Sequence, residues 1–395
     1  MTVGFLINTC EPFYRGGYER RAWNFARELA RQGHDVRIYT SCPRDETIDG
    51  VRFIRLAPPR CYFNSRGVRN GWADLLFALV CFKLLWKLKA RELGVLDICA
   101  TPFLHLPIAA FVARTKDTPA VLTCHEALLA GLPAYARERG YEGNILGALV
   151  VKILAVIYRL GTGLFTRRLA VSCRTATALE KEGYPAGGTV EFGLEPEAFN
   201  PDPPVAPLPG EPVRFIFCGR LTPIKSVSDT VTAFTSPLFE GKPFRFDIVG
   251  QGSERFGLER AVQQAGLGKS VFFHGEVDES AKRNLLARAE VFVLSSLREG
   301  FSIATLEAMA QGCAAIVLNN PKKPNGALDF VHDQREGLVV PPGVARLADA
   351  LATLCNDATL RLALRRAAWQ TARAYRIETQ AAKLMAFYRQ SCGSA

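Results

Sequence analysis

The sequence predicts an α/β protein of two domains, each with a parallel sheet flanked by helices. Its 395 residues exceed one ordinary core and suit two domains of about 150–200 residues. Short β-rich runs alternate with helical stretches in both halves of the chain. Between the halves, residues 200–212 hold six prolines in thirteen positions, so this segment neither pairs into a sheet nor propagates a helix. We interpret it as an interdomain linker.

The first half begins with a β-loop-α-β unit. A strand at 3–7 and a loop precede residues 18–32, which carry apolar side chains at helical spacing. A second strand at 36–40 completes the unit, since parallel strands need a crossover helix between them. Three more strands are predicted in this half, at 98–101, 120–124 and 169–172.

The second half repeats the alternation. Strands are predicted at residues 214–218, 245–249, 271–274, 291–294, 315–318 and 338–340. Helices fill the gaps, among them 280–289 with Asp278 as its N-cap. Two such halves leave a cleft between them, and ligands of open α/β sheets bind beyond the carboxyl ends of the strands. We therefore look for the site in the loops that follow strands.

The net charge and the cysteine content indicate which binding partners and which cellular compartment to expect. The chain has 49 Lys+Arg against 38 Asp+Glu, a net charge of +11, which favours nucleic acid, an acidic membrane surface or a phosphorylated ligand. The eleven cysteines are widely spaced and form no C-x-x-C pair, so we expect reduced thiols and a cytoplasmic location. The start, MTVGFLINT, lacks the basic region of a signal peptide. Residues 145–165 contain Lys152 and Arg159, so we reject a transmembrane helix there.

The loop after the strand 214–218 carries two cations. Gly219 opens the loop, and Arg220 and Lys225 follow it, five residues apart. Arginine offers a planar fork for phosphate oxygens and lysine a point charge, so the two can converge on one anion. On position alone, an anion clamp and a solvated basic loop are equally good interpretations.

The segment 299–307 follows the strand 291–294 and opens a helix. Backbone N–H groups at 302–304 would point into the cleft, where the positive end of the helix dipole attracts phosphate. Glu299 lies in the loop, and Glu307 lies just over a turn inside the helix, where a carboxylate suits two ribose hydroxyls. Taken alone, each glutamate is also an ordinary solvated or first-turn acid.

Weaker signals lie elsewhere. Gly16 and Gly17 stand at the first strand-to-helix junction, where paired glycines let a backbone approach a ligand, although most such pairs are plain turns. His125 follows the strand 120–124 and faces the cleft in this architecture, although a lone histidine more often makes a structural hydrogen bond. The run Gly-Gln-Gly at 250–252 lacks the third glycine of a dinucleotide fingerprint, so NAD binding is discounted.

Several motifs are absent from the sequence. It contains no D-x-D, which disfavours a metal-bound sugar-nucleotide site, and neither a P-loop nor a G-x-S-x-G elbow. It contains no zinc finger and no RRM or KH pattern, so nucleic acid is not expected as a partner.

These pieces together resemble the retaining, sugar-nucleotide-dependent glycosyltransferases of the GT-B fold, the glycosyltransferase group 1 family. The resemblance covers nearly the whole chain. The matching segments are GGYERRAWNFARELARQGHDVRIYT, LAVSCRTATALEKEGY, GLEPEAFNP, CGRLTPIK, DIVGQGS, VFFHGEV, AEVFVLSSLREGFSIATLEAMAQGCAAIV and GLVVPPG. The long block is the most specific, since it carries the family's E-x(7)-E pair as Glu299 and Glu307.

The resemblance implies two Rossmann-like domains with a deep interdomain cleft. The N-terminal domain would be the acceptor side (1–205) and the second the donor-binding domain (206–374), with a final helix (375–395) that crosses back to the first. It also implies a retaining, metal-independent hexosyltransferase that needs no cofactor. The donor would be a UDP-sugar or GDP-mannose, and the acceptor a hydroxyl of a glycan, glycolipid or small molecule.

The resemblance also implies roles for individual residues. Arg220, Lys225, His125 and Glu299 would take part in catalysis. In the donor pocket, Arg220 and Lys225 would bind the diphosphate, Glu307 the ribose and Glu299 the sugar. The rest of that pocket would be formed by Gly219, Gly300, Phe301, Ser302 and Ile303. Gly16 and Gly17 would form an acceptor or phosphate loop, and His125 would lie near the reaction centre. The chain departs from the family at Ser226 and Ser302, where glycine is usual, and at 192–195, where an Asn-Gly-Val-Asp-like turn is usual.

Three alternatives were weighed against transfer. A sugar-nucleotide epimerase would need a second set of carboxylates facing the sugar, and a retaining glycosidase would need two carboxyls about 5–5.5 Å apart. A non-catalytic sugar-nucleotide-binding protein is the third alternative, and the intact set of Arg220, Lys225, Glu299 and Glu307 argues against it.

Residues 52–91 hold nine Lys or Arg and one Asp, together with many apolar and aromatic side chains. A basic amphipathic helix of this kind suits an anionic membrane surface, which would place the protein peripherally on the inner face of the membrane. A core-packed helix with a solvated basic face is an equally good interpretation.

Overall fold

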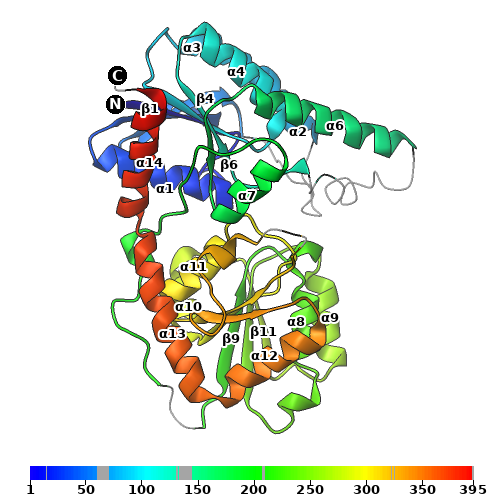
Figure 1. Ribbon diagram of the computed structural model, residues 1–395. Coiled ribbons are helices and arrows are strands. Elements are labelled where there is room, and N and C mark those ends of the chain that lie inside the picture. Colours follow the sequence, from blue (N-terminus) through cyan, green and yellow to red (C-terminus); the bar gives the residue numbers. More distant parts are fainter. Residues whose placement is uncertain are drawn as a thin grey trace. The chain divides into compact units, whose positions relative to one another are not determined.

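The computed structural model describes residues 1–14, 16–59, 71–129, 132, 145–206, 210–321, 323 and 325–393. The chain divides into two compact units, whose elements are labelled in Figure 1. Unit 1 comprises Met1–Gly193 and Ile377–Ala395, and unit 2 comprises Leu194–Arg376. Each unit is an α/β layer structure on a largely parallel sheet, which confirms the predicted fold class of two Rossmann-like domains.

The described strands of unit 1 form one sheet in the order β3-β4-β2-β1-β5-β6-β7-β8. Neighbouring strands pair in parallel except β3 and β4, which are antiparallel. The strands are β1 (Thr2–Leu6), β2 (Asp35–Ser41), β3 (Glu46–Ile48), β4 (Val51–Ala57), β5 (Val95–Cys99), β6 (Ala120–Cys124), β7 (Arg168–Ala170) and β8 (Gly188–Thr189). The α-helices are α1 (Gly17–Arg31), α2 (Gly71–Val80), α3 (Leu84–Lys87), α4 (Leu106–Thr115), α6 (Ile145–Gly163), α7 (Cys173–Lys181) and α14 (Ile377–Cys392).

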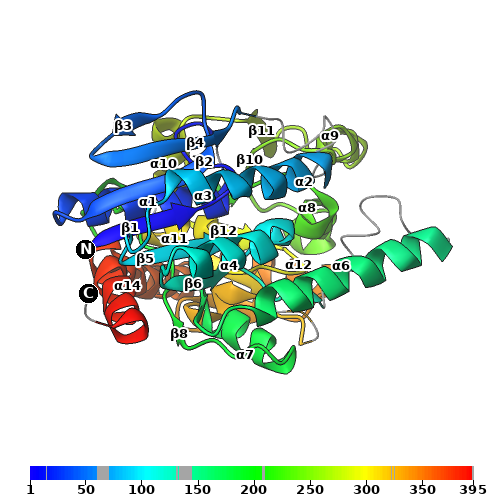
Figure 2. The same ribbon diagram turned by 90° about the horizontal axis from the view of Figure 1, so that it is seen from above.

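Helices cover both faces of this sheet, because alternate residues of a strand point to opposite faces. On β1, Phe5 belongs to the apolar cluster that contains Phe25 of α1 and Tyr388 of α14. The next residue, Leu6, belongs to the cluster on the other face, which contains Phe77 of α2. On that second face, α4 packs between α2 and α6, and the three helices lie side by side in Figure 2.

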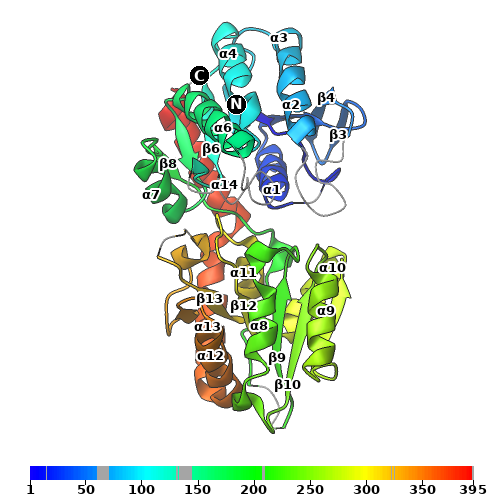
Figure 3. The same cartoon turned by 90° about the vertical axis from the view of Figure 1, so that its right-hand side faces the viewer.

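Unit 2 has a wholly parallel sheet in the order β11-β10-β9-β12-β13-β14 (Figure 3). Helix α8 packs against α9 and α12, and α11 packs against α10 and α13. The strands are β9 (Val213–Cys218), β10 (Phe244–Val249), β11 (Val271–Gly275), β12 (Val291–Leu294), β13 (Ala314–Leu318) and β14 (Gly337–Val340). The helices are α8 (Val227–Ala233), α9 (Arg255–Gln264), α10 (Glu279–Arg288), α11 (Ile303–Ala310), α12 (Val344–Asn356) and α13 (Ala358–Ala372).

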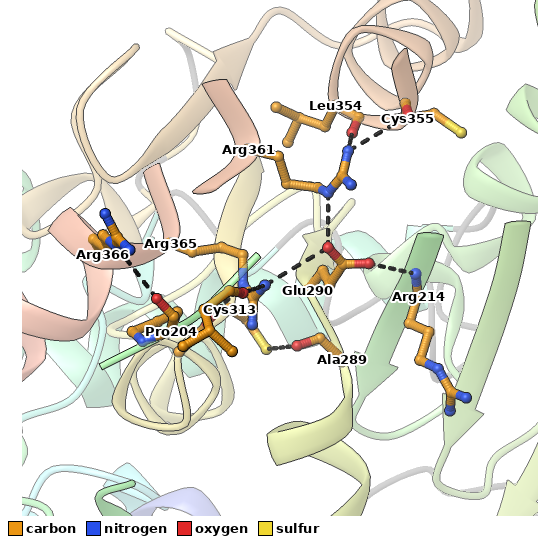
Figure 4. A network of polar contacts seen from close by, with 12 residues as sticks. Pro204, Arg214, Ala289, Glu290, Cys313, Leu354, Cys355, Arg361, Arg365 and Arg366 are labelled. Atoms are coloured by element: carbon orange, nitrogen blue, oxygen red, sulfur yellow. Dashed lines mark hydrogen bonds and ion pairs between the residues drawn. The ribbon is translucent and has the colours of Figure 1, made fainter. Parts of the chain in front are cut away.

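A buried ionic network ties α13 to the sheet of unit 2 (Figure 4). The Nε of Arg361 donates to Oε2 of Glu290 at 2.8 Å, and the two side chains are only 4% and 8% exposed. Arg365 approaches the same carboxylate at 3.6 Å and donates to the carbonyl of Gly312. The backbone N–H of Arg214, in β9, donates to the other oxygen of Glu290. One carboxylate therefore joins the start of β12 to β9 and α13.

Most predicted strands agree with the structure to within a residue or two. The strand expected at 98–101 instead spans Val95–Cys99, because the chain turns out of the sheet toward Pro102, which has no N–H to donate. Sequence analysis missed the β3–β4 hairpin, although Asp49 and Gly50 form its two-residue turn with positive φ, a strong hairpin signal. No helix within the described ranges combines the length and apolar character that a membrane crossing needs.

The unit boundaries lie elsewhere than the predicted domain limits of 205/206 and 374/375. The chain passes from unit 1 to unit 2 at Gly193–Leu194 and returns at Arg376–Ile377. The proline-rich segment belongs to unit 2, because its carbonyls accept hydrogen bonds from α13. Trp369 donates to the carbonyl of Asn200 at 2.9 Å. Arg366 donates to that of Pro204 at 3.2 Å, as Figure 4 shows. Proline lacks an N–H but keeps its carbonyl as an acceptor.

Candidate active site

The cationic loop of unit 2 follows β9 and packs on the loop that follows β10. A side chain at Gly250 would place its Cβ 1.9 Å from the carbonyl oxygen of Gly219, and one at Gly252 would lie 2.1 Å from that of Leu221. The backbone N–H of Leu221 donates to the carbonyl of Gln251 at 2.8 Å. The glycines at 250 and 252 therefore let the two loops touch, which explains them without a dinucleotide. Arg220, held on this loop, is exposed.

Lys225 is fixed by the neighbouring strand and contacts Glu299. Its carbonyl accepts a hydrogen bond from the hydroxyl of Ser295, just beyond β12, at 2.9 Å. Its Nζ lies 2.5 Å from Oε1 of Glu299, and the two side chains are 22% and 12% exposed. Strands β9 and β12 are neighbours in the sheet, so the loops that follow them meet at one edge. The structure thus brings together two of the predicted site residues and excludes an ordinary solvated glutamate at 299.

The backbone of Glu299 and Gly300 is held by a third loop. The N–H of Gly326 donates to the carbonyl of Glu299 at 3.0 Å. A Cβ at Gly326 would lie 2.0 Å from the carbonyl oxygen of Gly300, so the close approach requires glycine. The neighbouring Asn325 is 3% exposed and anchors this loop by donating to the carbonyl of Leu318 at 2.9 Å. Sequence analysis did not identify these two residues.

Helix α11 starts directly after this loop. Ser302 precedes Ile303, the first residue of the helix, and has φ 68° and ψ 71° in the left-handed region. Its hydroxyl contacts that of Thr305 at 2.8 Å, and does not cap a backbone N–H of α11. The first N–H groups of a helix have no intrahelical acceptor, so this end of α11 favours an anion. Phe301 is 6% exposed and packs on Phe330, so its side chain anchors the loop and only its backbone is available.

Glu307 is buried inside α11 and pairs with a lysine that sequence analysis missed. Its two carboxylate oxygens lie 3.0 and 2.9 Å from the Nζ of Lys282, on α10. Lys282 also lies 3.0 Å from Glu279, one turn earlier on its own helix. Because Glu307 is only 7% exposed, the solvated interpretation of this residue is wrong. Nothing in the spacing of the sequence indicates that α10 delivers the cation.

In unit 1, Tyr18 links the paired glycines to His125. Gly16 and Gly17 begin α1, and the ring of Tyr18 lies 4.5 Å, between centroids, from that of His125. The hydroxyl of Tyr18 donates to Glu126 at 3.2 Å. The two weaker signals from the sequence therefore belong to one site at the carboxyl ends of β1 and β6.

His125 is buried, with 6% of its surface exposed. Burial, and then the positive charge of Arg21, hold the pKa of His125 well below its usual value, so the imidazole is neutral at pH 7. Its Nδ1 lies 3.6 Å from the sulfur of Cys99. Beside these groups is a cavity of about 10 Å³, close to the space that one water molecule needs.

A buried polar pair next to this cavity fixes α14 on unit 1. The hydroxyl of Tyr388 donates to Oδ2 of Asp97, on β5, at 2.5 Å. Burial raises the pKa of Asp97, while the hydrogen bond from Tyr388 and the positive charge of Arg21 oppose that rise. The guanidinium of Arg21 donates to the carbonyl of Val190 at 3.0 Å. The sequence offers no signal for the hydrogen bond between Tyr388 and Asp97, which lie 291 positions apart.

Metal ligands were sought among the same residues. In the ranges that the structure describes, no group of three His, Cys, Asp or Glu side chains gathers as a metal-binding set. The nine cysteines whose side chains the structure describes are thiols, and burial raises the pKa of Cys124 and Cys313 to about 12. Buried thiols of this kind are poor nucleophiles, so the charged residues are the better candidates for catalysis.

Two Rossmann-like units, of which one carries a paired lysine and glutamate beside a helix N-terminus, are the layout that a GT-B glycosyltransferase has. Comparisons with known families agree with this class. The model for glycosyl transferases group 1 matches residues 199–371, and that for glycosyltransferase family 4 matches residues 15–190. The second half of the chain therefore matches the glycosyltransferase group 1 model and the first half the family 4 model, and together the two matches support a group 1 glycosyltransferase.

Known proteins resemble nearly the whole chain. The glycogen synthase of Mycobacterium tuberculosis is 26% identical over 367 residues, which cover 88% of this chain and 84% of that protein. Among solved structures, sucrose-phosphate synthase from Thermosynechococcus elongatus aligns with a TM-score of 0.78 at 19% identity, over 98% of both chains. Anabaena HepE, solved in complex with UDP-glucose, aligns with a TM-score of 0.68 at 16% identity, over 98% of this chain and 99% of that one. At these identities the structural likenesses show the GT-B fold.

Proposed function

We propose that this glycosyltransferase moves a sugar from a nucleotide diphosphate donor, of the UDP-sugar or GDP-mannose type, to an acceptor hydroxyl. The acceptor class is a glycan, glycolipid or small molecule, and the anomeric configuration is retained. The observation that carries the proposal is the contact of Lys225 with Glu299 beside the start of α11. In this proposal Lys225 binds a phosphate of the donor, and the neighbouring carboxylate of Glu299 accepts a hydroxyl of the donor sugar. The UDP-glucose bound by the HepE structure supports this class of donor.

The chemistry follows from where charge develops. Transfer breaks the bond between the anomeric carbon and the phosphate oxygen, so negative charge grows on the departing diphosphate and positive charge on the sugar. Arg220, Lys225 and the N-terminus of α11 stabilise the diphosphate without a metal ion. Glu299 accepts a hydrogen bond from a hydroxyl of the donor sugar. It lies next to Lys225, which binds the departing diphosphate.

Glu307 is proposed to hold the ribose. A carboxylate has about four acceptor positions, so Glu307 can accept ribose hydroxyls beside its contacts with Lys282. The ammonium group of Lys282 fixes the plane of the carboxylate. Buried and paired in this way, Glu307 keeps its orientation before the donor arrives.

His125 is proposed to contact the transferred sugar or the acceptor. Its imidazole is neutral at pH 7 because of burial and Arg21, so it offers a hydrogen bond and no positive charge. Gly16 and Gly17 form the adjoining loop at the start of α1. We further propose a cytoplasmic location, supported by the nine thiols, and peripheral attachment to an anionic membrane through residues 52–91. Residues 60–70 of that segment lie outside the described ranges.

The test replaces Lys225 and Glu307 separately with alanine and measures sugar transfer or donor hydrolysis with a panel of nucleotide sugars. Loss of one fixed donor to a developing charge costs about 10²–10³ in rate. Lys269→Ala, at an exposed lysine of unit 2, is the matched control and should keep the rate. Near-normal turnover in both site variants would contradict the assignment. Activity should also survive excess EDTA, and NMR of the first-formed product should show the anomeric configuration of the donor.

A further inference from the structure

One helix layer of unit 1 exposes most of the large apolar side chains that the described residues leave on the surface. Eleven of the fourteen exposed large apolar side chains lie on the helices α2, α3, α4 and α6 or on the turn Cys81–Lys83 between α2 and α3. These residues, which we call the helix-layer surface, are Trp72, Leu75, Leu76, Leu79, Phe82, Trp86, Phe111, Leu149, Ile153, Val156 and Leu160. Contiguous apolar exposure of this kind marks an interaction site.

Helix α6 carries four of these residues in a single stripe. Leu149, Ile153, Val156 and Leu160 are spaced by four, three and four positions, so at 100° per residue they lie within an arc of about 60°. Their exposed fractions are 51%, 49%, 53% and 65%. On its other side the helix joins the core through Tyr158, which is 2% exposed. The structure therefore orients this stripe outward.

The charges beside the stripes are positive. Within α2, α3, α4, α6 and the turn after α2, the cations are Lys83, Lys87, Arg114, Lys152 and Arg159, of which Lys87 pairs with Asp45 at 3.3 Å. The acid of the same segments, Asp74, is 2% exposed and does not present its charge. Lys152 and Arg159 are seven residues apart and flank the stripe of α6 on one side, where long side chains can reach from an apolar layer to a charged headgroup.

We propose that the helix-layer surface binds the anionic face of a lipid bilayer, with the stripe of α6 inserted among the acyl chains, and that the acceptor is accordingly a lipid-linked glycan. The acceptor class rests on the proposed transferase function. A second copy of the chain fits this surface poorly, because a two-fold interface would bring together two patches of the same positive charge. An anionic bilayer matches both the apolar stripes and the cations around them.

The experiment is co-sedimentation of the full chain with vesicles of phosphatidylcholine alone or mixed with phosphatidylglycerol. The wild-type chain should bind the mixed vesicles, and binding should weaken at high salt. A variant with four substitutions on α6 should bind the mixed vesicles at least about tenfold more weakly. The substitutions are Leu149→Ser, Ile153→Ser, Val156→Ser and Leu160→Ser. Lys152→Gln with Arg159→Gln should weaken it by about fivefold per charge on the mixed vesicles.

The matched control is Phe256→Ser with Leu238→Ser, two exposed apolar residues of unit 2 that should leave binding unchanged. Equal binding by the control and the α6 variant, or no binding by the wild-type chain at low salt, would overturn the proposal. So would a wild-type dimer in sedimentation analysis that the α6 variant loses. Donor hydrolysis without acceptor is measured in parallel. If the chain hydrolyses a nucleotide sugar but does not bind vesicles, the proposed membrane-binding surface is wrong. If it binds vesicles but hydrolyses no nucleotide sugar, the proposed transferase chemistry is wrong.

Discussion

Replacing Glu290 with glutamine keeps the shape of the side chain and removes the carboxylate shared by Arg361 and Arg365. Arg361 is 3% exposed and lies 2.8 Å from that carboxylate. Its guanidinium also donates to the carbonyls of Leu354 and Cys355, so it stays in place as a buried cation when the counter-charge is gone. Removing one partner of a buried ion pair typically costs about 3–5 kcal/mol, and we expect a loss of that size in unit 2.

The assay is urea unfolding monitored by hydrogen-exchange mass spectrometry. Peptides from β9, β12 and β13 report unit 2 separately from unit 1. Glu259→Gln is the control, because Glu259 pairs with Arg255 at 2.7 Å on the surface of α9, with 41% of its side chain exposed. Exposed pairs of this spacing contribute about 0.3–0.5 kcal/mol. A loss from Glu290→Gln no larger than the loss from the control would refute the structural role given to the network in Figure 4.

Three other changes have defined outcomes. Gly326→Ala places a Cβ 2.0 Å from the carbonyl oxygen of Gly300, so it should shift the Glu299 loop and lower kcat for transfer at least about tenfold in a folded protein. Tyr388→Phe leaves Asp97 buried without its hydroxyl donor and should cost unit 1 about 1–3 kcal/mol in urea unfolding. The lowered pKa of His125 means that the unfolded chain takes up the proton first. From His125 alone, unit 1 should therefore lose up to about 1.4 kcal/mol per pH unit below about pH 6.5, and His125→Asn should reduce the slope and leave the smaller contribution of His34, whose pKa burial also lowers.

The strands, and the loops that carry the candidate site residues, follow from the sequence where local patterns predict them. Strands β9 and β12 are mostly apolar, and the loops after them carry Lys225 and Glu299. The contact between these two side chains follows once both strands are placed as neighbours in a parallel sheet. The boundary between the units was misplaced, since proline content excludes a strand or helix but does not say which unit the segment packs against.

The partners that hold the site in place could not be predicted. Lys282 reaches Glu307 from another helix, and Asn325 with Gly326 reaches Glu299 from the loop after β13. Such contacts depend on how helices and loops pack in three dimensions, which no residue spacing encodes. They also decide between interpretations that the sequence left open, because burial excludes a solvated role for Glu307.

The two serines at family glycine positions show that the backbone of the donor pocket keeps the conformation that glycine favours. Ser226 has φ 48° and Ser302 has φ 68°, both in the left-handed region, which costs an L-residue about 1–2 kcal/mol. Each hydroxyl has a local partner, at 2.8 Å from Asp229 for Ser226 and at 2.8 Å from Thr305 for Ser302. Because both serines have left-handed φ angles, each adds a hydroxyl to its loop in a backbone conformation that glycine also favours. The proposal that Lys225 and the start of α11 share one diphosphate therefore does not depend on glycine at either position.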